Sequence, residues 1–152
     1  RARLILEALE AVSAVWGSER VGLRISPLSS YNSMIDSDPA GLSSWLAARL
    51  NDYRLAYLHV IRGDVYRQQS GDVLTPIRQI GNMGYSAEEA ERDIAAGKVD
   101  AVAFGVSFLA NPDLPARIKT GAPLNEPNPA TFYTFDAEGY TDYPTLNPAP
   151  EH

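Results

Sequence analysis

The stretch IGNMGYSAEEAE, residues 80–91, places two glycines directly before a segment that has the pattern of a helix start. Ser86 is followed three residues later by Glu89, which is the capping-box spacing. Glycine costs conformational entropy on folding, so Gly81 and Gly84 predict either a turn with positive φ or a close backbone approach to another group. Free N–H groups at a helix start bind anions, which makes this turn a candidate anion site.

Arg24 and His59 are two further residues that could do chemistry. Arg24 lies in the apolar segment GLRIS, where a buried cation needs a partner, and the pattern alone favours an internal ion pair. His59 lies in YLHVI, and a single histidine in a strand is more often a hydrogen-bonded core residue than a catalyst. The other histidine is His152 and the chain has no cysteine, so the sequence predicts no metal site.

The composition excludes several classes of function. The 152 residues carry a formal net charge of −6 and are 45% hydrophobic, which suits one globular unit and argues against nucleic acid or an anionic membrane as a partner. No apolar run reaches the roughly 18 residues of a membrane span, and no signal peptide is visible, so we expect a cytoplasmic protein. The chain begins at Arg1 in helical periodicity and without a methionine, which is typical of a piece of a longer polypeptide.

Helical and strand patterns alternate along the chain. The expected elements are a helix over 5–16, a strand over 21–25, a helix over 42–51, a strand over 55–61, a short broken helix over 73–80, a helix over 87–96, a strand over 99–105 and short helical pieces over 106–121. This order predicts a parallel sheet in an α/β fold, with polar loops after the strands, where such folds bind ligands. We expect Trp16 and Trp45 in the core, and the strand over 55–61 covered on both faces.

One expected strand is nearly missing. If the broken helix extends to about Arg78, only Gln79 and Ile80 remain before Gly81 to form a strand. Either this connection is shortened or residues are absent from the sequence. The three clear strands cannot close a barrel by themselves.

Several motifs together resemble one known family. The segments VGLRISP, YLHV, GNMGYSAEEAE, VDAVAFG, FLANPDLPARIKTGAPLN and TFYT…GYTDYP are similar, in this order, to the C-terminal half of the old yellow enzyme family. Its members are FMN-dependent ene-reductases on a (β/α)8 TIM barrel. The resemblance implies that residues 1–152 are the C-terminal half of a single barrel domain, incomplete alone. It would have parallel strands with outer helices and an irregular C-terminal tail over 122–152, packed by its aromatic side chains.

The resemblance also implies where the FMN phosphate binds. The backbone amides after the seventh and eighth strands of the family hold the phosphate, and these positions fall on Met83 and Gly84, then on Gly105 and Val106. A side chain at Gly84 would crowd the phosphate. Many members carry Arg or Lys where this chain has Val106, so only the Val106 N–H is available and phosphate affinity is expected to be lower unless another cation substitutes.

The flavin ring and substrate positions follow from the same resemblance. It places Arg24 beside flavin N1 and the C2 carbonyl, where a guanidinium stabilises the charge of the reduced ring. It places Phe132 and Tyr133 near the dimethylbenzene edge and the substrate mouth. No catalytic residue is expected in this half, because the substrate-binding pair and the proton donor of the family lie in the N-terminal half.

The resemblance implies a flavin-dependent NAD(P)H oxidoreductase in which FMN takes hydride from NAD(P)H and reduces the C=C bond of activated alkenes such as enones. The chain alone is expected to be inactive without a complementary N-terminal half barrel, on the same or a separate chain. The alternative is a non-catalytic phosphate-ligand binding module or a structural half-barrel. The sequence leaves open the preferred alkene, NADH versus NADPH, and whether the protein is a homo-oligomer.

Overall fold

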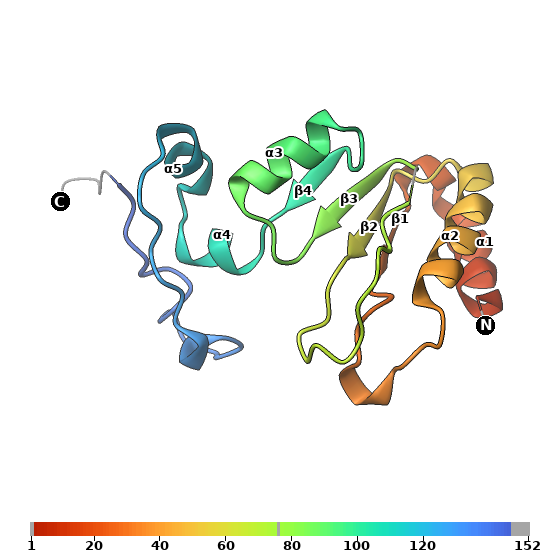
Figure 1. The fold of residues 1–152 in the computed structure, drawn as a ribbon, viewed down its shortest axis with the longest axis horizontal. Coiled ribbons are helices and arrows are strands. Elements are labelled where there is room, and N and C mark those ends of the chain that lie inside the picture. Colours follow the sequence, from red (N-terminus) through yellow and green to blue (C-terminus); the bar gives the residue numbers. More distant parts are fainter. Residues whose placement is uncertain (1, 76, 147–152) are drawn as a thin grey trace. The chain divides into compact units, whose positions relative to one another are not determined.

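The computed structural model describes residues 2–75 and 77–146 (Figure 1). In its first compact unit, Arg1–Ala103, the described residues form a four-stranded sheet, three α-helices and three short 3-10 helices. The strands are β1 (Gly22–Ile25), β2 (Tyr57–Ile61), β3 (Gln79–Asn82) and β4 (Ala101–Ala103), and the helices are α1 (Arg3–Trp16), α2 (Pro39–Leu50) and α3 (Ala87–Ala95). The strands pair in parallel in the order β1-β2-β3-β4. The predicted α/β fold with a parallel sheet is therefore confirmed.

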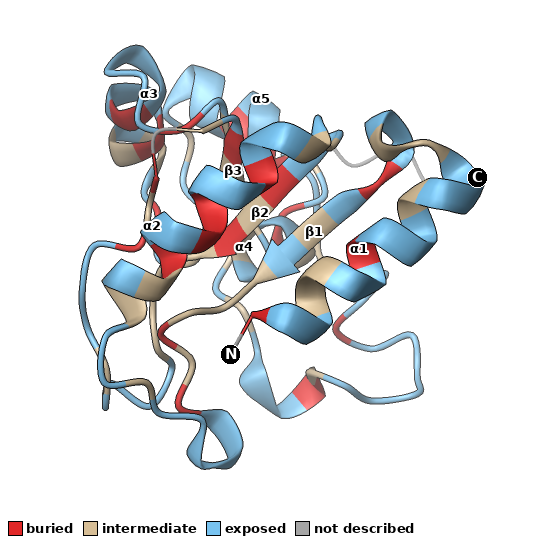
Figure 2. Cartoon of the chain, turned by 90° about the vertical axis from the view of Figure 1, so that its right-hand side faces the viewer, coloured by how far each residue is buried: buried red, intermediate tan, exposed pale blue. Residues whose placement is uncertain are grey.

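The two faces of the sheet differ in burial. Leu58 and Val60 of β2 are buried and form a core with apolar residues of α1 and α2. Figure 2 shows buried segments on α2, β2 and β3, whereas β1 is exposed or intermediate along its whole length. On the opposite face, Tyr57 is exposed and His59 is half-buried, so the expectation that both faces of β2 are covered is wrong for this chain. We call the face that carries Arg24, Tyr57, His59 and Asn82 the open face.

The connection between β2 and β3 contains no helix in its described residues, 62–75 and 77–78. Val73 instead packs in the core, and the buried side chain of Gln79 binds the backbone of the connection: its Nε2 donates to the Thr75 carbonyl and its Oε1 accepts from the Thr75 N–H at 3.3 Å. The helix expected over 73–80 is therefore wrong for the described residues; Pro76 lies outside them. In this connection the N–H and carbonyl of Thr75 are satisfied by the Gln79 side chain rather than by helical bonds.

The strand for which the sequence left almost no residues is present as β3. β3 has four residues and pairs with β2 on one side and β4 on the other. Arg78, where the broken helix was expected to end, is a bend, and Gln79 is the first residue of this strand. Pairing with two neighbours fixes a segment as a strand even where its own pattern is weak.

The start of α2 and the burial of two tryptophans differ from the expectation. α2 begins at Pro39 because the Asp38 side chain accepts a hydrogen bond from the Gly41 N–H at 2.9 Å and proline suits the first turn. Trp16 and Trp45 are 63% and 46% exposed, so their assignment to the core is wrong. Each helix buries a single stripe against the sheet, and both tryptophans lie outside it.

The second compact unit, Phe104–His152, is described by itself. It contains α4 (Val106–Ala110) and α5 (Leu114–Thr120), which match the short helical pieces that were expected. Pro115 lies in the first turn of α5, which tolerates proline, rather than breaking the helix. The described tail has one short 3-10 turn, and Tyr133 and Phe135 are fully exposed within this chain, so the expectation that its aromatic side chains pack it is wrong for these two.

Candidate functional site

Arg24 lies on the open face of β1, in register with His59 of β2. It is exposed, and it forms no ion pair with any residue that the structure describes, so the predicted buried ion pair is wrong. The reason is that no helix or strand of the first unit, as far as its described residues go, covers the open face. The guanidinium is therefore available to a ligand that lies on this face.

His59 lies beside this cation, in register with Arg24 on the neighbouring strand. Burial lowers the pKa of His59 below its usual value, the positive charge of Arg24 lowers it further, and the side chain of Asn82 acts in the opposite direction by hydrogen bonding. The buried Nε2 has no hydrogen-bond partner among the described residues, so the prediction of a hydrogen-bonded core histidine is wrong for this atom. Asn82 itself donates from Nδ2 to the Ala103 carbonyl at 2.7 Å, which ties β3 to β4.

The turn between β3 and α3 answers the question raised by its two glycines. Met83 and Gly84 have positive φ, +82° and +71°, so Gly84 supplies a conformation that side chains disfavour. A Cβ at Gly84 would meet no protein atom within 4 Å, which leaves open space beside the turn. Gly81 serves the other purpose, close approach, because a Cβ there would lie 2.6 Å from the Tyr85 hydroxyl oxygen.

The start of α3 offers unpaired backbone donors. Ser86 is its N-cap and accepts from the Glu89 N–H at 3.1 Å, as the capping-box spacing predicted. Among the described residues, the N–H groups of Met83 and Gly84 donate to no protein atom. The far end of the helix is closed by Gly97, whose φ is +69°. Two free donors beside open space and before a helix suit an anionic group.

Arg62 is a residue at this site that the sequence analysis missed. It follows β2, and its Nε donates to the Met83 carbonyl at 3.0 Å. Its two terminal nitrogens donate to the two Glu89 carboxylate oxygens at 2.7 Å each, and its guanidinium lies over the Tyr85 ring at 3.5 Å from the centroid. The sequence contains only a weak indication of this role, because Arg62 is a single arginine in the loop that follows an apolar strand.

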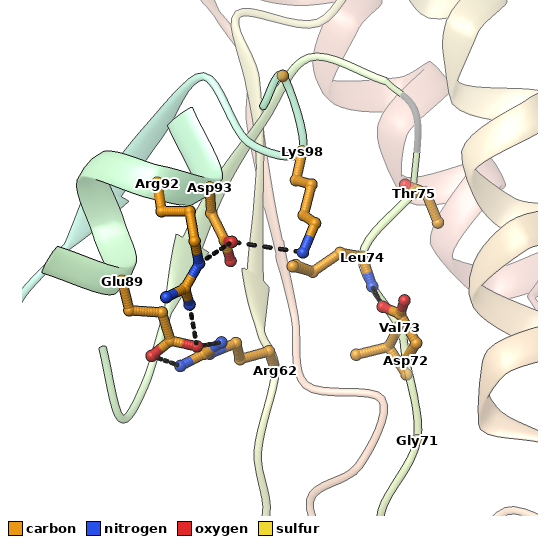
Figure 3. Close-up of a pocket in the computed structure, with 11 residues that line it drawn as sticks. Arg62, Gly71, Asp72, Val73, Leu74, Thr75, Glu89, Arg92, Asp93 and Lys98 are labelled. Atoms are coloured by element: carbon orange, nitrogen blue, oxygen red, sulfur yellow. Dashed lines mark hydrogen bonds and ion pairs between the residues drawn. The ribbon is translucent and has the colours of Figure 1, made fainter. Parts of the chain in front are cut away.

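A cavity of about 630 Å³ lies beside this arginine, between the connection 71–75 and α3 (Figure 3). Lys98 and Arg92 contact the buried Asp93 carboxylate at 3.4 and 3.8 Å. The cavity occupies the side of α3 next to a connection that has no helix in its described residues. The side of α3 that faces the cavity therefore carries charged side chains, and ion pairs hold them there.

The four remaining predicted residues lie in the second unit. Gly105 is the N-cap position of α4, and Val106, its first residue, is half-exposed with an aliphatic side chain that adds no charge. Phe132 is half-buried, whereas Tyr133 is 93% exposed and has φ +61°. Both aromatic residues lie in the second unit, whereas Arg24, Met83 and Gly84 lie in the first.

The motif NPDLPARIKTGAPLN holds the second unit together, a role that the sequence analysis did not assign. Arg117 is buried and donates from Nε to Asp113 at 2.7 Å, and from its terminal nitrogens to the carbonyls of Pro123 and Pro144. The Asn111 side chain accepts from the Asn125 N–H at 2.7 Å. These contacts tie the tail to α4 and α5, so this motif is structural.

The described residues show neither a metal site nor a membrane-spanning helix. The described residues contain no group of three or more His, Asp or Glu side chains that could hold a metal ion. In the same part of the chain, every helix is too short or too polar to cross a membrane.

The comparisons with known proteins point to one family. The profile of the NADH:flavin oxidoreductase / NADH oxidase family matches residues 1–125. A Leishmania infantum protein with the name "Probable flavin mononucleotide-dependent alkene reductase" is 46% identical over 96% of this chain and 41% of its own length. Arabidopsis thaliana 12-oxophytodienoate reductase 2 is 38% identical, over 96% of this chain and 42% of its own length.

Solved structures agree with these relatives. The old yellow enzyme from Trypanosoma cruzi superposes with a TM-score of 0.91 at 49% identity, over 96% of this chain and 40% of that one. Morphinone reductase superposes with a TM-score of 0.85 at 39% identity, over 95% of this chain and 41% of that one. The chain thus spans about two fifths of the length of the proteins it matches. Its sheet is part of a TIM barrel, as the sequence predicted.

Proposed function

Because the chain belongs to the NADH:flavin oxidoreductase / NADH oxidase family, we propose that it is part of an FMN-dependent ene-reductase, reduced by NAD(P)H and acting on activated alkenes such as enones. The observation that carries the proposal is the turn between β3 and α3. It combines two free backbone donors, the positive φ of Gly84 and open space where a Cβ of that residue would lie. This arrangement fits the phosphate of FMN.

The open face of the sheet fits the rest of the cofactor. Arg24 offers an exposed guanidinium with no ion-pair partner in the described chain, and we assign to it the N1 and C2 carbonyl edge of the flavin. A fixed positive charge there stabilises negative charge on the reduced ring. When bound, FMN supplies the hydride chemistry; the chain binds and orients it through Arg24, Met83 and Gly84.

We assign the residues of the second unit by the family resemblance. Gly105 and Val106 would supply further backbone contacts to the phosphate, without the cation that many family members carry at Val106. Phe132 and Tyr133 would border the dimethylbenzene edge and the substrate mouth. The exposure of Tyr133 supports this assignment, because an aromatic side chain without packing partners in its own unit is free to contact a ligand.

Catalysis requires a complementary N-terminal half barrel in this proposal, on the same or a separate chain. The substrate-binding pair and the proton donor would come from that half, and this chain alone would be inactive. We call the chain together with its complementary half the assembled protein. The cytoplasmic location and the homo-oligomer stay predictions from the sequence.

The test is a spectrum of the assembled protein followed by turnover. We expect a yellow protein that releases FMN on denaturation, and that consumes NADH or NADPH when a cyclic enone is added. Bound FMN without loss of the enone C=C bond would contradict the substrate class alone. A colourless, folded assembled protein that does not take up FMN would contradict the proposal and favour the alternative, a phosphate-ligand binding or structural half-barrel.

A further inference from the structure

The turn that we assign to the FMN phosphate has a conformation that its own sequence does not stabilise. Met83 has φ +82°, which a side chain other than glycine adopts at a cost in free energy. Gly84 follows with φ +71° and adds flexibility rather than constraint. A turn of this kind keeps its two free N–H groups aimed in one direction only if neighbouring groups hold it.

Arg62 supplies three such contacts from one side chain. Its Nε binds the carbonyl of Met83, its guanidinium stacks on Tyr85, and its terminal nitrogens bind both carboxylate oxygens of Glu89. The contacted residues lie within the turn, directly after it and in the first turn of α3. One planar group therefore fixes the turn relative to β2 and to the helix, with the bidentate geometry that arginine favours.

The charge of Arg62 is already used by protein groups. Glu89 neutralises it through two short contacts, and the two side chains are 22% and 28% exposed. The arginine also removes a repulsive effect, since an unpaired Glu89 at the start of α3 would oppose an anion there. Its effect on a phosphate would thus be exerted through the backbone of the turn.

We infer that Arg62 is a positioning residue that holds the Met83–Gly84 turn in the conformation that binds the phosphate of FMN. The inference rests on the proposed function. The described residues of the connection between β2 and β3 form no helix that could pack against the start of α3. The Arg62 contacts fix the start of α3 instead, beside the cavity.

The test compares Arg62→Met with Arg92→Met in the assembled protein. Arg92 is a matched control, because it also reaches Glu89, at 3.9 Å, but contacts neither Met83 nor Tyr85. Binding of FMN and of riboflavin, which lacks the phosphate, is measured by quenching of flavin fluorescence. We expect Arg62→Met to reduce the preference for FMN over riboflavin by about tenfold or more, because the turn loses the contacts that aim its N–H groups, and Arg92→Met to keep the preference.

A second measurement needs no flavin. Amide hydrogen exchange over residues 83–90 should be faster in flavin-free Arg62→Met than in the wild type or Arg92→Met, because the turn and the first bonds of α3 loosen. If Arg62→Met does not fold, Arg62→Lys is used, which keeps the charge but cannot span Met83 and both Glu89 oxygens. Unchanged exchange together with an unchanged preference for FMN would overturn the inference alone. A wild type that binds both flavins equally would overturn the proposed phosphate role of the turn, and the inference with it.

Discussion

Because Arg24 is exposed, its charge is available to a ligand instead of being part of a buried ion pair. A guanidinium in an apolar strand segment suggested a buried ion pair, but it lies exposed on the open face beside His59, whose pKa is lowered by burial and by the charge of Arg24. An exposed arginine that the described chain leaves without an ion-pair partner costs little to maintain and is free to respond to a charged ligand. Its effect should therefore appear in the energetics of the ligand rather than in the stability of the fold.

We predict that Arg24→Met in the assembled protein lowers the midpoint potential of bound FMN by roughly 30–60 mV, the equivalent of about 1.5–3 kcal/mol for a charge-assisted contact. FMN affinity should change less, because the guanidinium acts mainly on charge that is present only after reduction. A reductive titration beside a binding titration separates the two effects. Arg3→Met, on α1 and paired with Glu7, is the control. An unchanged potential would contradict the role of Arg24 even if affinity fell.

The two glycines of the β3–α3 turn should fail in different ways when each is replaced by alanine. Gly81→Ala would place a Cβ against Tyr85, so we expect a loss of about 1–3 kcal/mol in the free energy of unfolding. Gly84→Ala meets no atom and should cost only the backbone strain of positive φ, about 1–2 kcal/mol, but it should reduce FMN occupancy strongly. Thermal melts and flavin occupancy are measured on both variants. Full occupancy in Gly84→Ala would show that the turn does not face the phosphate.

Elements with a strong local signal were predictable from the sequence, and elements fixed by tertiary contacts were not. α3 is bounded by the Ser86 cap and by Gly97, which are local signals, and its position was predicted to within one residue. β3 and the connection before it depend on Gln79, a buried amide that binds the backbone of Thr75 and Lys98. No pattern of neighbouring residues indicates such contacts, so a helix was expected there instead.

The same distinction holds for the candidate site. The glycine turn was identified from composition and spacing, because positive φ and close approach both favour glycine. Arg62 was missed, since its three partners lie 21 to 27 residues later in the chain and meet it only through the parallel pairing of β2 with β3. Residue assignments that came from the resemblance, such as Phe132 and Tyr133, stay predictions.

The loops after β1 and β2 are joined by several contacts, and those of the Asp64 carboxylate are sensitive to acid. Asp64 accepts hydrogen bonds from the N–H and hydroxyl of Ser30 and from the Gln68 N–H. Burial raises the pKa of Asp64, but these hydrogen bonds outweigh it and lower the pKa from 3.8 to about 2. The folded pKa lies below the unfolded one, so the stabilisation is complete above pH 3.8 and is lost as the pH falls toward about 2.

We therefore predict that Asp64→Asn destabilises the assembled protein near neutral pH, and that the difference from the wild type shrinks as the pH falls through this window. Unfolding free energies of both proteins measured from pH 6 down to about 2 test the prediction, with Asp52→Asn as a surface control. A difference that stays constant across the acid range would mean that the Asp64 carboxylate does not stabilise the two loops.

At the scale of the whole molecule, the sheet of this chain is open. Its edge strands, β1 and β4, each pair with only one neighbour. The apolar side chains of Leu4, Val15 and Trp16 on α1 are exposed. Unpaired edges and exposed apolar side chains favour association with other chains, and a closed barrel would remove both edges.

We predict that the 152-residue chain expressed alone is insoluble or forms a molten state, because in the described residues both edge strands of its sheet have a single neighbour and no element of the first unit covers the open face. A molten state would keep its far-UV circular dichroism, lose its near-UV signal and bind a hydrophobic dye. Co-expression with the N-terminal part of the Trypanosoma cruzi old yellow enzyme, whose structure the chain matches at a TM-score of 0.91, should restore a cooperative melt and, under the proposed function, flavin absorbance. A sharp melt of the monomeric chain alone would refute this prediction. It would show that the helix-covered face by itself buries enough apolar surface to offset the entropy of folding.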